Sequence, residues 1–313
     1  MQRDPWHNDF PMTTTRVAEI IAADLPDFPD PRVTVLGEGW DYTTFLVDEE
    51  WVFRFPKRRQ WVRQLARERK MLDALAEPLA RQSIAIPRYR YHVEEPVLSK
   101  VAYVGYRFLA GEPLVDCHAD SLDRGAIARQ LGEFLRLLQA TAPTRKPRTY
   151  HDQFPSDLIA FRQELDEASV ALPPAIAEGC RMALERAPPI DYEPPRFQHG
   201  DLGVEHILID RGRSEIVSII DWGDAGWGNR IADLVGLWTW GGDRAVRAAL
   251  PEWNQTLASD DWARLRQWGI AYAVGSAYYG YKDGRDPLHA AALGWLERIH
   301  DAGQLADPGT SDA

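Results

Sequence analysis

The stretch that most constrains the fold of this chain is HGDLGVEHILIDRGRSEIVSIIDWGDAG. Ile207–Ile209 and Ile216–Ile220 are short apolar runs rich in β-branched residues, and the turn-forming residues DRG follow the first run. This pattern predicts a β-hairpin. Asp201 and His206 precede its first strand, and Asp221 directly follows its second. The hairpin would therefore hold two carboxylates and an imidazole at the ends of its strands.

The type, order and spacing of these polar residues match the phosphoryl-transfer site of protein kinases. There, an HxD loop supplies a base for the attacking hydroxyl, a metal ligand follows five residues later, and a second Asp begins a DFG turn. The matching residues here are His199, Asp201, His206 and the Asp221 of DWG. We expect Asp201 to be the base, His199 to support the loop, and His206 and Asp221 to bind Mg²⁺. Polar residues that only form turns in a loop would not be expected to match the kinase site at four positions.

HGDLGVEHILID followed by IIDWGDAG resembles the aminoglycoside phosphotransferase family. Most members carry Asn where this chain has His206, and His is similar to the subgroup of aminoglycoside 2″-phosphotransferases and macrolide phosphotransferases. The resemblance implies a bilobed, protein-kinase-like α+β fold, with a small lobe of antiparallel sheet plus helix and a larger, mostly helical lobe. We expect a nucleotide-binding lobe at 1–108 and a catalytic and substrate-binding lobe at 109–313, joined through 109–113. Imidazole is protonated in acid, so metal binding through His206 should weaken as pH falls.

The N-terminal part reads as a helix over 14–25 and strands over 33–36, 43–47 and 51–55. Gly37 and Gly39 stand in the first turn between strands, where they would let backbone amides approach phosphates. Tyr42 occupies the position of the third glycine of GxGxxG, and such a turn taken alone is usually just a hairpin.

The third strand, WVFRFPK, places Val52 and Arg54 on one face by its period of two. We expect Val52 to lie against the base and Arg54 to hold the phosphates, with Lys57 as the second choice. Glu68 falls on the apolar stripe of an amphipathic helix over 61–79, where a buried carboxylate needs a cationic partner. We favour a buried ion pair between Glu68 and Arg54. The alternative is a half-exposed Glu68 that pairs with a neighbouring cation of its own helix.

Further strands are predicted near 85–91 and 102–108, before the turn LAGEPL. Tyr106, Phe108 and Leu109 would line the base of the nucleotide. No residue type here separates guanine from adenine, and the resemblance alone favours GTP over ATP.

Composition sets the broad class of the protein. The chain has 313 residues, 45% of them hydrophobic, a net charge of −11 and two cysteines, Cys117 and Cys180. An acidic chain is a poor partner for nucleic acid, and it either attracts cations or is simply soluble. The start lacks an apolar signal region, no apolar run of about 18 residues exists, and two cysteines are too few for a disulfide framework, so we expect a cytoplasmic protein without membrane contact. The sequence does not fix the oligomeric state, and a monomer is the working expectation.

The C-terminal part reads as helical over 127–138, 156–172, 174–186 and 260–303, and Asp233 is expected to have a structural role at a helix start. In the family, the acceptor pocket lies between the catalytic loop and the C-terminal helices. The candidate acceptor-binding residues by position are Glu205, Asp224, Asp260, Asp261, Trp268 and Tyr278. Taken singly, each acid reads as a surface charge and each aromatic residue as core.

The motif predicts a phosphotransferase, and the resemblance implies that it moves the γ-phosphate of GTP or ATP to a hydroxyl of an antibiotic, an aminoglycoside first of all, and thereby confers resistance. A macrolide or another hydroxylated metabolite is the alternative acceptor. A nucleotide-binding pseudokinase is a less favoured alternative, suggested by Arg54 in place of Lys and by the missing third glycine.

Overall fold

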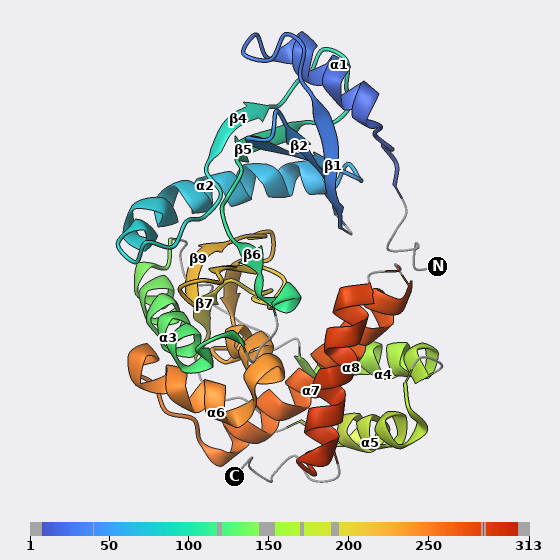
Figure 1. Cartoon of the computed structure of the whole chain (residues 1–313), viewed down its shortest axis with the longest axis vertical. Helices are drawn as coiled ribbons and strands as arrows, with labels where there is room; N and C mark the ends of the chain where they lie inside the picture. The colour runs from blue at the N-terminus through green and yellow to red at the C-terminus, as the bar shows by residue number, and fades with distance from the viewer. Residues whose placement is uncertain are drawn as a thin grey trace. The chain divides into compact units, whose positions relative to one another are not determined.

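The structure is a computed structural model that describes residues 8–39, 41–117, 121–143, 154–169, 172–188, 194–282, 284 and 286–305. The chain divides into two compact units (Figure 1). The N-terminal unit comprises Met1–Ala80 and Ala85–Leu109, and the C-terminal unit comprises Arg81–Ile84 and Ala110–Ala313.

The N-terminal unit is built on a five-stranded antiparallel sheet in the order β1-β2-β3-β5-β4. The elements of this unit are α1 (Thr14–Asp24), β1 (Val33–Glu38), β2 (Tyr42–Val47), β3 (Trp51–Pro56), α2 (Trp61–Ala80), β4 (Tyr89–Val93) and β5 (Tyr103–Arg107). The strand expected over 85–91 was placed too early. It begins at Tyr89, two residues after Pro87, which has no N–H to give to a sheet.

Alternation along the strands divides the side chains between two apolar layers. Phe53 and Phe55 of β3 pack with Val17 of α1 in one core cluster, and Tyr42 of β2 packs with Leu65 of α2 in another. Thr13 caps α1 by accepting a hydrogen bond from the amide of Arg16. The period of two therefore leaves Arg54 on the opposite face of β3 from the two phenylalanines.

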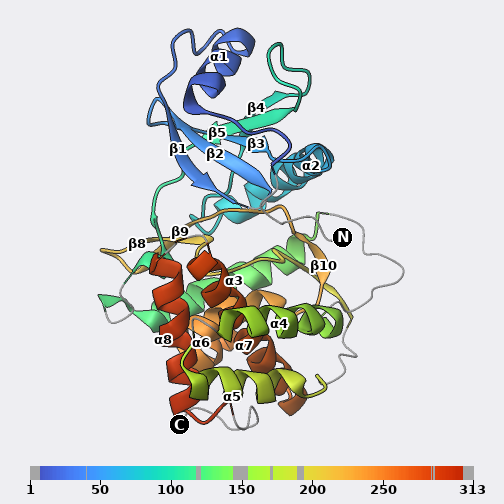
Figure 2. The ribbon, with the colours of Figure 1, turned by 90° about the vertical axis from the view of Figure 1, so that its right-hand side faces the viewer.

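The C-terminal unit is mostly helical and carries two small sheets (Figure 2). The elements of this unit are β6 (Glu112–Pro113), η1 (Leu114–Asp116), α3 (Arg124–Thr141), α4 (Phe154–Ala168), α5 (Pro174–Glu185), β7 (Arg196–Gln198), β8 (Ile207–Asp210), β9 (Glu215–Ile219), β10 (Gly226–Gly228), η4 (Ala232–Leu234), α6 (Val235–Trp253), α7 (Ser259–Lys282) and α8 (Asp286–Asp301). The predicted hairpin is present as the antiparallel strands β8 and β9, and β6 pairs antiparallel with the other edge of β8. The expected α+β fold with a helical C-terminal part is confirmed.

Close helix packing holds this unit together. A Cβ on Gly132 of α3 would come within 2.2 Å of the Ala249 carbonyl of α6, so the two helices approach too closely for a side chain there. Arg266 of α7 pairs with Asp243 of α6, and both side chains are buried. Among the described helices, none combines the length and apolar character needed to span a membrane.

Candidate active site

The loop that carries Asp201 is anchored from behind by a buried carboxylate. Asp233 is 1% exposed, and its two oxygens accept hydrogen bonds from the backbone amides of His199 and Gly200, at 2.8 and 2.9 Å. Burial raises the pKa of Asp233 to about 6, although both hydrogen bonds oppose this shift. Asp233 thus acts on the loop rather than as the cap of α6, whose N-cap is Leu234.

Gly200 is required by the shape of this loop. Its φ of +89° lies in a region that side-chain-bearing residues avoid, and a Cβ there would stand 2.5 Å from the carbonyl oxygen of Asp224. The loop therefore packs tightly at Gly200 against the backbone of Asp224, in the segment that follows β9.

His199 links the loop to the end of β9. Its Nδ1 accepts a hydrogen bond from the Asp201 amide at 3.3 Å, so Nε2 carries the proton and donates to the Ile220 carbonyl at 3.0 Å. Burial lowers the pKa of His199 to about 3, which keeps the ring neutral. The ring packs 4.6 Å from that of Trp222, a fully buried residue of the DWG turn. Its contacts make His199 a positioning residue.

Asp201 combines access to solvent with a surplus of nearby negative charge. Its side chain is 43% exposed, yet protein atoms surround it on the remaining sides, and this burial raises its pKa to about 7. The carboxylates of Glu205, Asp221 and Asp224 raise the pKa further, and His206 lowers it. A carboxylate with a pKa near neutrality is suited to accept a proton from a hydroxyl.

His206 lies between Asp201 and Asp221. Its Nδ1 is 2.8 Å from the Asp201 carbonyl oxygen, an arrangement in which Nδ1 donates, and its Nε2 is 3.8 Å from Oδ2 of Asp221. Burial alone would lower the pKa of His206, but the charges of Asp201, Glu205 and Asp221 raise it to about 9. The Asp221 backbone has a φ of +61°, which is unusual for a residue with a side chain and marks a constrained turn.

The donor atoms of His206 and Asp221 are compatible with one shared divalent cation. Two ligands on opposite sides of Mg²⁺ are about 4.2 Å apart, so 3.8 Å is within reach. In the described part of the chain no group of three or more His, Cys, Asp or Glu side chains is arranged to hold a metal. Two protein ligands fit Mg²⁺ in a phosphoryl-transfer site, because waters and substrate phosphates complete its shell.

The N-terminal unit contains the expected pair of charges. Nη1 of Arg54 is 2.8 Å from Oε1 of Glu68, and both side chains are almost fully buried. Nη1 also donates to the Tyr89 hydroxyl at 3.0 Å, and the guanidinium lies 4.2 Å from the centre of the Tyr42 ring. Lys57, the second choice, is instead paired with Glu38 at 2.8 Å.

The other expected nucleotide residues lie in the N-terminal unit. Gly37 is in β1, Gly39 follows β1, Val52 is buried in β3, and Tyr106 is buried in β5. Phe108 is 46% exposed, and Leu109 ends this unit. A Cβ on Gly37 would meet no atom within 4 Å, so the fold itself does not demand glycine there.

The expected acceptor-binding residues are placed in different surroundings. Glu205 accepts a hydrogen bond from the Tyr272 hydroxyl at 2.6 Å, and the side chain of Asp261 pairs with that of Arg230. Two aromatic candidates contact other side chains of the C-terminal unit: Trp268 stacks on Phe154, and the Tyr278 hydroxyl donates to Glu167. The side chains of Asp224 and Asp260 are exposed. Only Glu205 and Asp224 of this set act electrostatically on Asp201.

Sequence reasoning missed the tyrosines that fix the two carboxylates. Tyr89 lies beside the Arg54–Glu68 pair, and Tyr272 holds Glu205 from 67 residues away in the chain. A buried tyrosine implies a partner for its hydroxyl, which was the available signal, but it does not name the partner.

Comparisons with known proteins show the family and the fold of the chain. The sequence profile of the phosphotransferase enzyme family matches residues 32–268. Similar solved structures include an aminoglycoside phosphotransferase with GDP and kanamycin (23% identity, 91% of this chain and 98% of that one, TM-score 0.67) and a wild-type aminoglycoside 2'-phosphotransferase with GDP (22%, 93% and 100%, 0.70). A macrolide 2'-phosphotransferase of type I is also similar (20% identity, 91% of this chain and 98% of that one, TM-score 0.57). No curated protein sequence matches the chain significantly. Because the profile spans most of the chain, the protein belongs to the phosphotransferase enzyme family.

Proposed function

We propose that this enzyme moves the γ-phosphate of GTP or ATP to a hydroxyl group of a small-molecule antibiotic. The observation that carries the proposal is the arrangement of Asp201, His206 and Asp221 at one end of the β8–β9 hairpin. It provides a proton acceptor of raised pKa next to two groups suited to a divalent cation.

Asp201 acts as the base in the transfer. The hydroxyl oxygen of the acceptor attacks the γ-phosphorus while its proton passes to the Asp201 carboxylate. The bond from the γ-phosphorus to the oxygen that bridges to the β-phosphate breaks, and the nucleoside diphosphate leaves. His199 and Asp233 hold the loop and do not contact the reacting atoms.

His206 and Asp221 are the residues that would hold Mg²⁺. When bound, the cation neutralises charge on the β- and γ-phosphate oxygens. The Nδ1 hydrogen bond to the Asp201 carbonyl leaves Nε2 as the donor atom on the side of Asp221. Because the pKa of His206 is raised, binding must displace a proton, and acid should weaken it.

Arg54 and the residues near it would bind the nucleotide. A guanidinium matches phosphate oxygens, and Glu68 and Tyr89 fix its position. Gly37 and Gly39 would let the backbone approach the phosphates, and Val52, Tyr106, Phe108 and Leu109 would line the base. GTP is the preferred donor of this proposal, with ATP as the alternative. The similar structures include complexes described with GDP and with ADP.

The charge around Asp201 supports an acceptor that carries an ammonium group near the reacting hydroxyl. Glu205 and Asp224 add two negative charges to those of Asp201 and Asp221. Aminoglycosides carry several ammonium groups and macrolides usually carry one, so both classes meet this requirement. Transfer to either would confer resistance in a host.

The test is to incubate the purified protein with Mg²⁺, GTP or ATP and a panel of aminoglycosides and macrolides. We expect one class to gain the mass of one phosphate. Nucleotide binding without any phosphorylated product across both classes would instead support a pseudokinase.

A further inference from the structure

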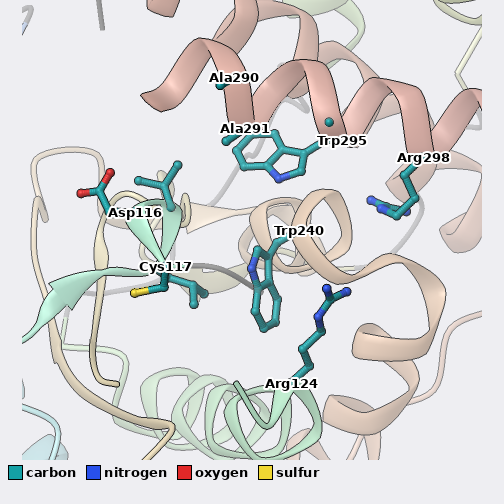
Figure 3. Close-up of a pocket in the computed structure, with 11 residues that line it drawn as sticks. Asp116, Cys117, Arg124, Trp240, Ala290, Ala291, Trp295 and Arg298 are labelled. Carbon is teal, nitrogen blue, oxygen red and sulfur yellow. The ribbon is translucent and has the colours of Figure 1, made fainter. Parts of the chain in front are cut away.

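A pocket of about 750 Å³ opens in the C-terminal unit (Figure 3). Its size is in the range of small-molecule sites. Side chains from η1, the start of α3, α6 and α8 line it, among them Leu114, Asp116, Arg124, Trp240, Trp295 and Arg298. In Figure 3 the two indoles lie on different sides of the pocket, and the nitrogen-bearing edge of Trp240 is turned toward the side of Cys117.

Two sets of contacts connect this pocket to the catalytic loop. The amide of the lining residue Val115 donates to the carbonyl of Val204 at 3.2 Å. On the other side, the Trp295 ring stacks on Tyr272 with a centroid distance of 6.2 Å, and Tyr272 donates to Glu205 at 2.6 Å. The pocket therefore adjoins the residues that immediately follow Asp201.

The lining of the pocket differs in character from the catalytic loop. Among the residues that the structure describes, the lining is largely aromatic and aliphatic, and its charged members are two arginines and one aspartate. The Arg124 guanidinium lies 5.6 Å from the Trp240 ring centre, and Arg298 donates to the carbonyl of Thr239 at 2.5 Å. A molecule with several ammonium groups would place positive charge against this surface and lose water without compensation.

Trp240 adds a specific hydrogen-bond donor. The residue is 5% exposed, and its indole N–H is enclosed without a hydrogen-bond acceptor in the part of the chain that the structure describes. An enclosed N–H without an acceptor is unfavourable. The nitrogen has almost no exposed surface in the structure, so a ligand oxygen would reach it, and be bound selectively, only if the indole turns as the pocket fills.

Resting on the proposed function, we propose that the acceptor is an amphiphilic amino alcohol, bound in two parts. Its single ammonium group, next to the reacting hydroxyl, contacts Glu205, which Tyr272 holds in place. Its apolar body occupies the pocket and presents a carbonyl, ether or hydroxyl oxygen to Trp240. Among antibiotics, macrolides have this chemistry and aminoglycosides, as polycations without an apolar body, do not.

Titration calorimetry on the intact protein without nucleotide tests this proposal. A macrolide should bind, and kanamycin should bind at least about 10-fold more weakly. Ala291→Phe fills the pocket and should weaken macrolide binding at least about 10-fold, whereas Leu293→Phe, on the same helix but outside the lining, should not. Tighter binding of kanamycin, or equal macrolide affinity in both variants, would overturn the proposal.

Trp240→Phe keeps an aromatic ring but removes the pyrrole half of the indole together with its N–H. It should weaken macrolide binding about 3- to 10-fold. Its control, Trp253→Phe in the same helix, removes an N–H that donates to Gln139 at 3.2 Å and should leave macrolide binding unchanged. Equal effects of both variants on binding would count against the donor role. If Ala291→Phe still transfers phosphate to its acceptor at the natural rate, the acceptor does not use this pocket. That result would overturn the inference and leave the phosphotransferase proposal intact.

Discussion

At the residue scale, the catalytic loop depends on two ionisable side chains that burial keeps in unusual states. His199 is held neutral, with its pKa lowered to about 3, and Asp233 has its pKa raised to about 6. Both are engaged in hydrogen bonds with the backbone of the loop or of Ile220, which directly follows β9. These two side chains thus fix the place of Asp201 in the loop.

His199 should make the fold sensitive to acid. In the unfolded chain its pKa returns to about 6.5, so below that pH the unfolded state binds more protons and stability falls as pH drops toward the folded value of about 3. Between pH 7 and 5 this contribution amounts to about 2 kcal/mol. Urea unfolding at both pH values should show that His199→Gln loses this part of the pH dependence. An unchanged pH dependence in the variant would show that His199 is protonated in the folded protein.

The stability that Asp233 gives to the loop should fall when one of its two acceptor oxygens is lost. Asp233→Asn keeps one oxygen but turns an NH₂ group toward a backbone N–H, so we expect the free energy of unfolding to fall by about 1–3 kcal/mol. Asp30→Asn, which changes an exposed acid in the same way, should change it by less than about 0.5 kcal/mol. Similar urea midpoints for the two variants would contradict the anchoring role.

At the scale of secondary-structure elements, local periodicity predicted the charged pair of the N-terminal unit. Arg54 follows from the period of two in β3, and Glu68 from the apolar stripe of α2. Tyr89 could not be assigned in this way, because β4 reaches the pair only through pairing within the sheet. The β8–β9 hairpin was predictable for the same local reason. The contact between Asp233 and His199 was not, since 34 residues separate them.

Variants of the Arg54–Glu68 pair should change the stability of the protein and its affinity for nucleotide independently. Arg54→Met removes the cationic partner of a buried carboxylate and should cost about 3–5 kcal/mol of stability. Adding Glu68→Leu should recover most of this loss in urea unfolding. GDP affinity, measured by calorimetry, should stay weak in both variants because the guanidinium is absent. Recovery of GDP binding in the double variant would remove Arg54 from the nucleotide site.

At the scale of the whole molecule, the two units carry different chemical tasks. The N-terminal unit holds the arginine proposed for the phosphates, and the C-terminal unit holds the proposed base, the proposed metal-binding pair and the pocket. The sequence predicted the fold, and its local motifs pointed to Asp201, His206 and Asp221, which the structure brings close together. It could not predict the pocket, whose lining comes from segments between Leu114 and Arg298 that meet only in the folded unit.

The most direct test of the central claim is mass spectrometry of an antibiotic panel after incubation with Mg²⁺ and GTP or ATP, comparing the natural sequence with Asp201→Asn. We predict that the natural sequence adds one phosphate to at least one antibiotic. Asp201→Asn should retain nucleotide affinity while the transfer rate falls about 10²- to 10⁴-fold, because the base is lost. Equal rates of transfer by both proteins would contradict the role of Asp201, and the absence of product from the natural sequence across the panel would contradict the proposed function.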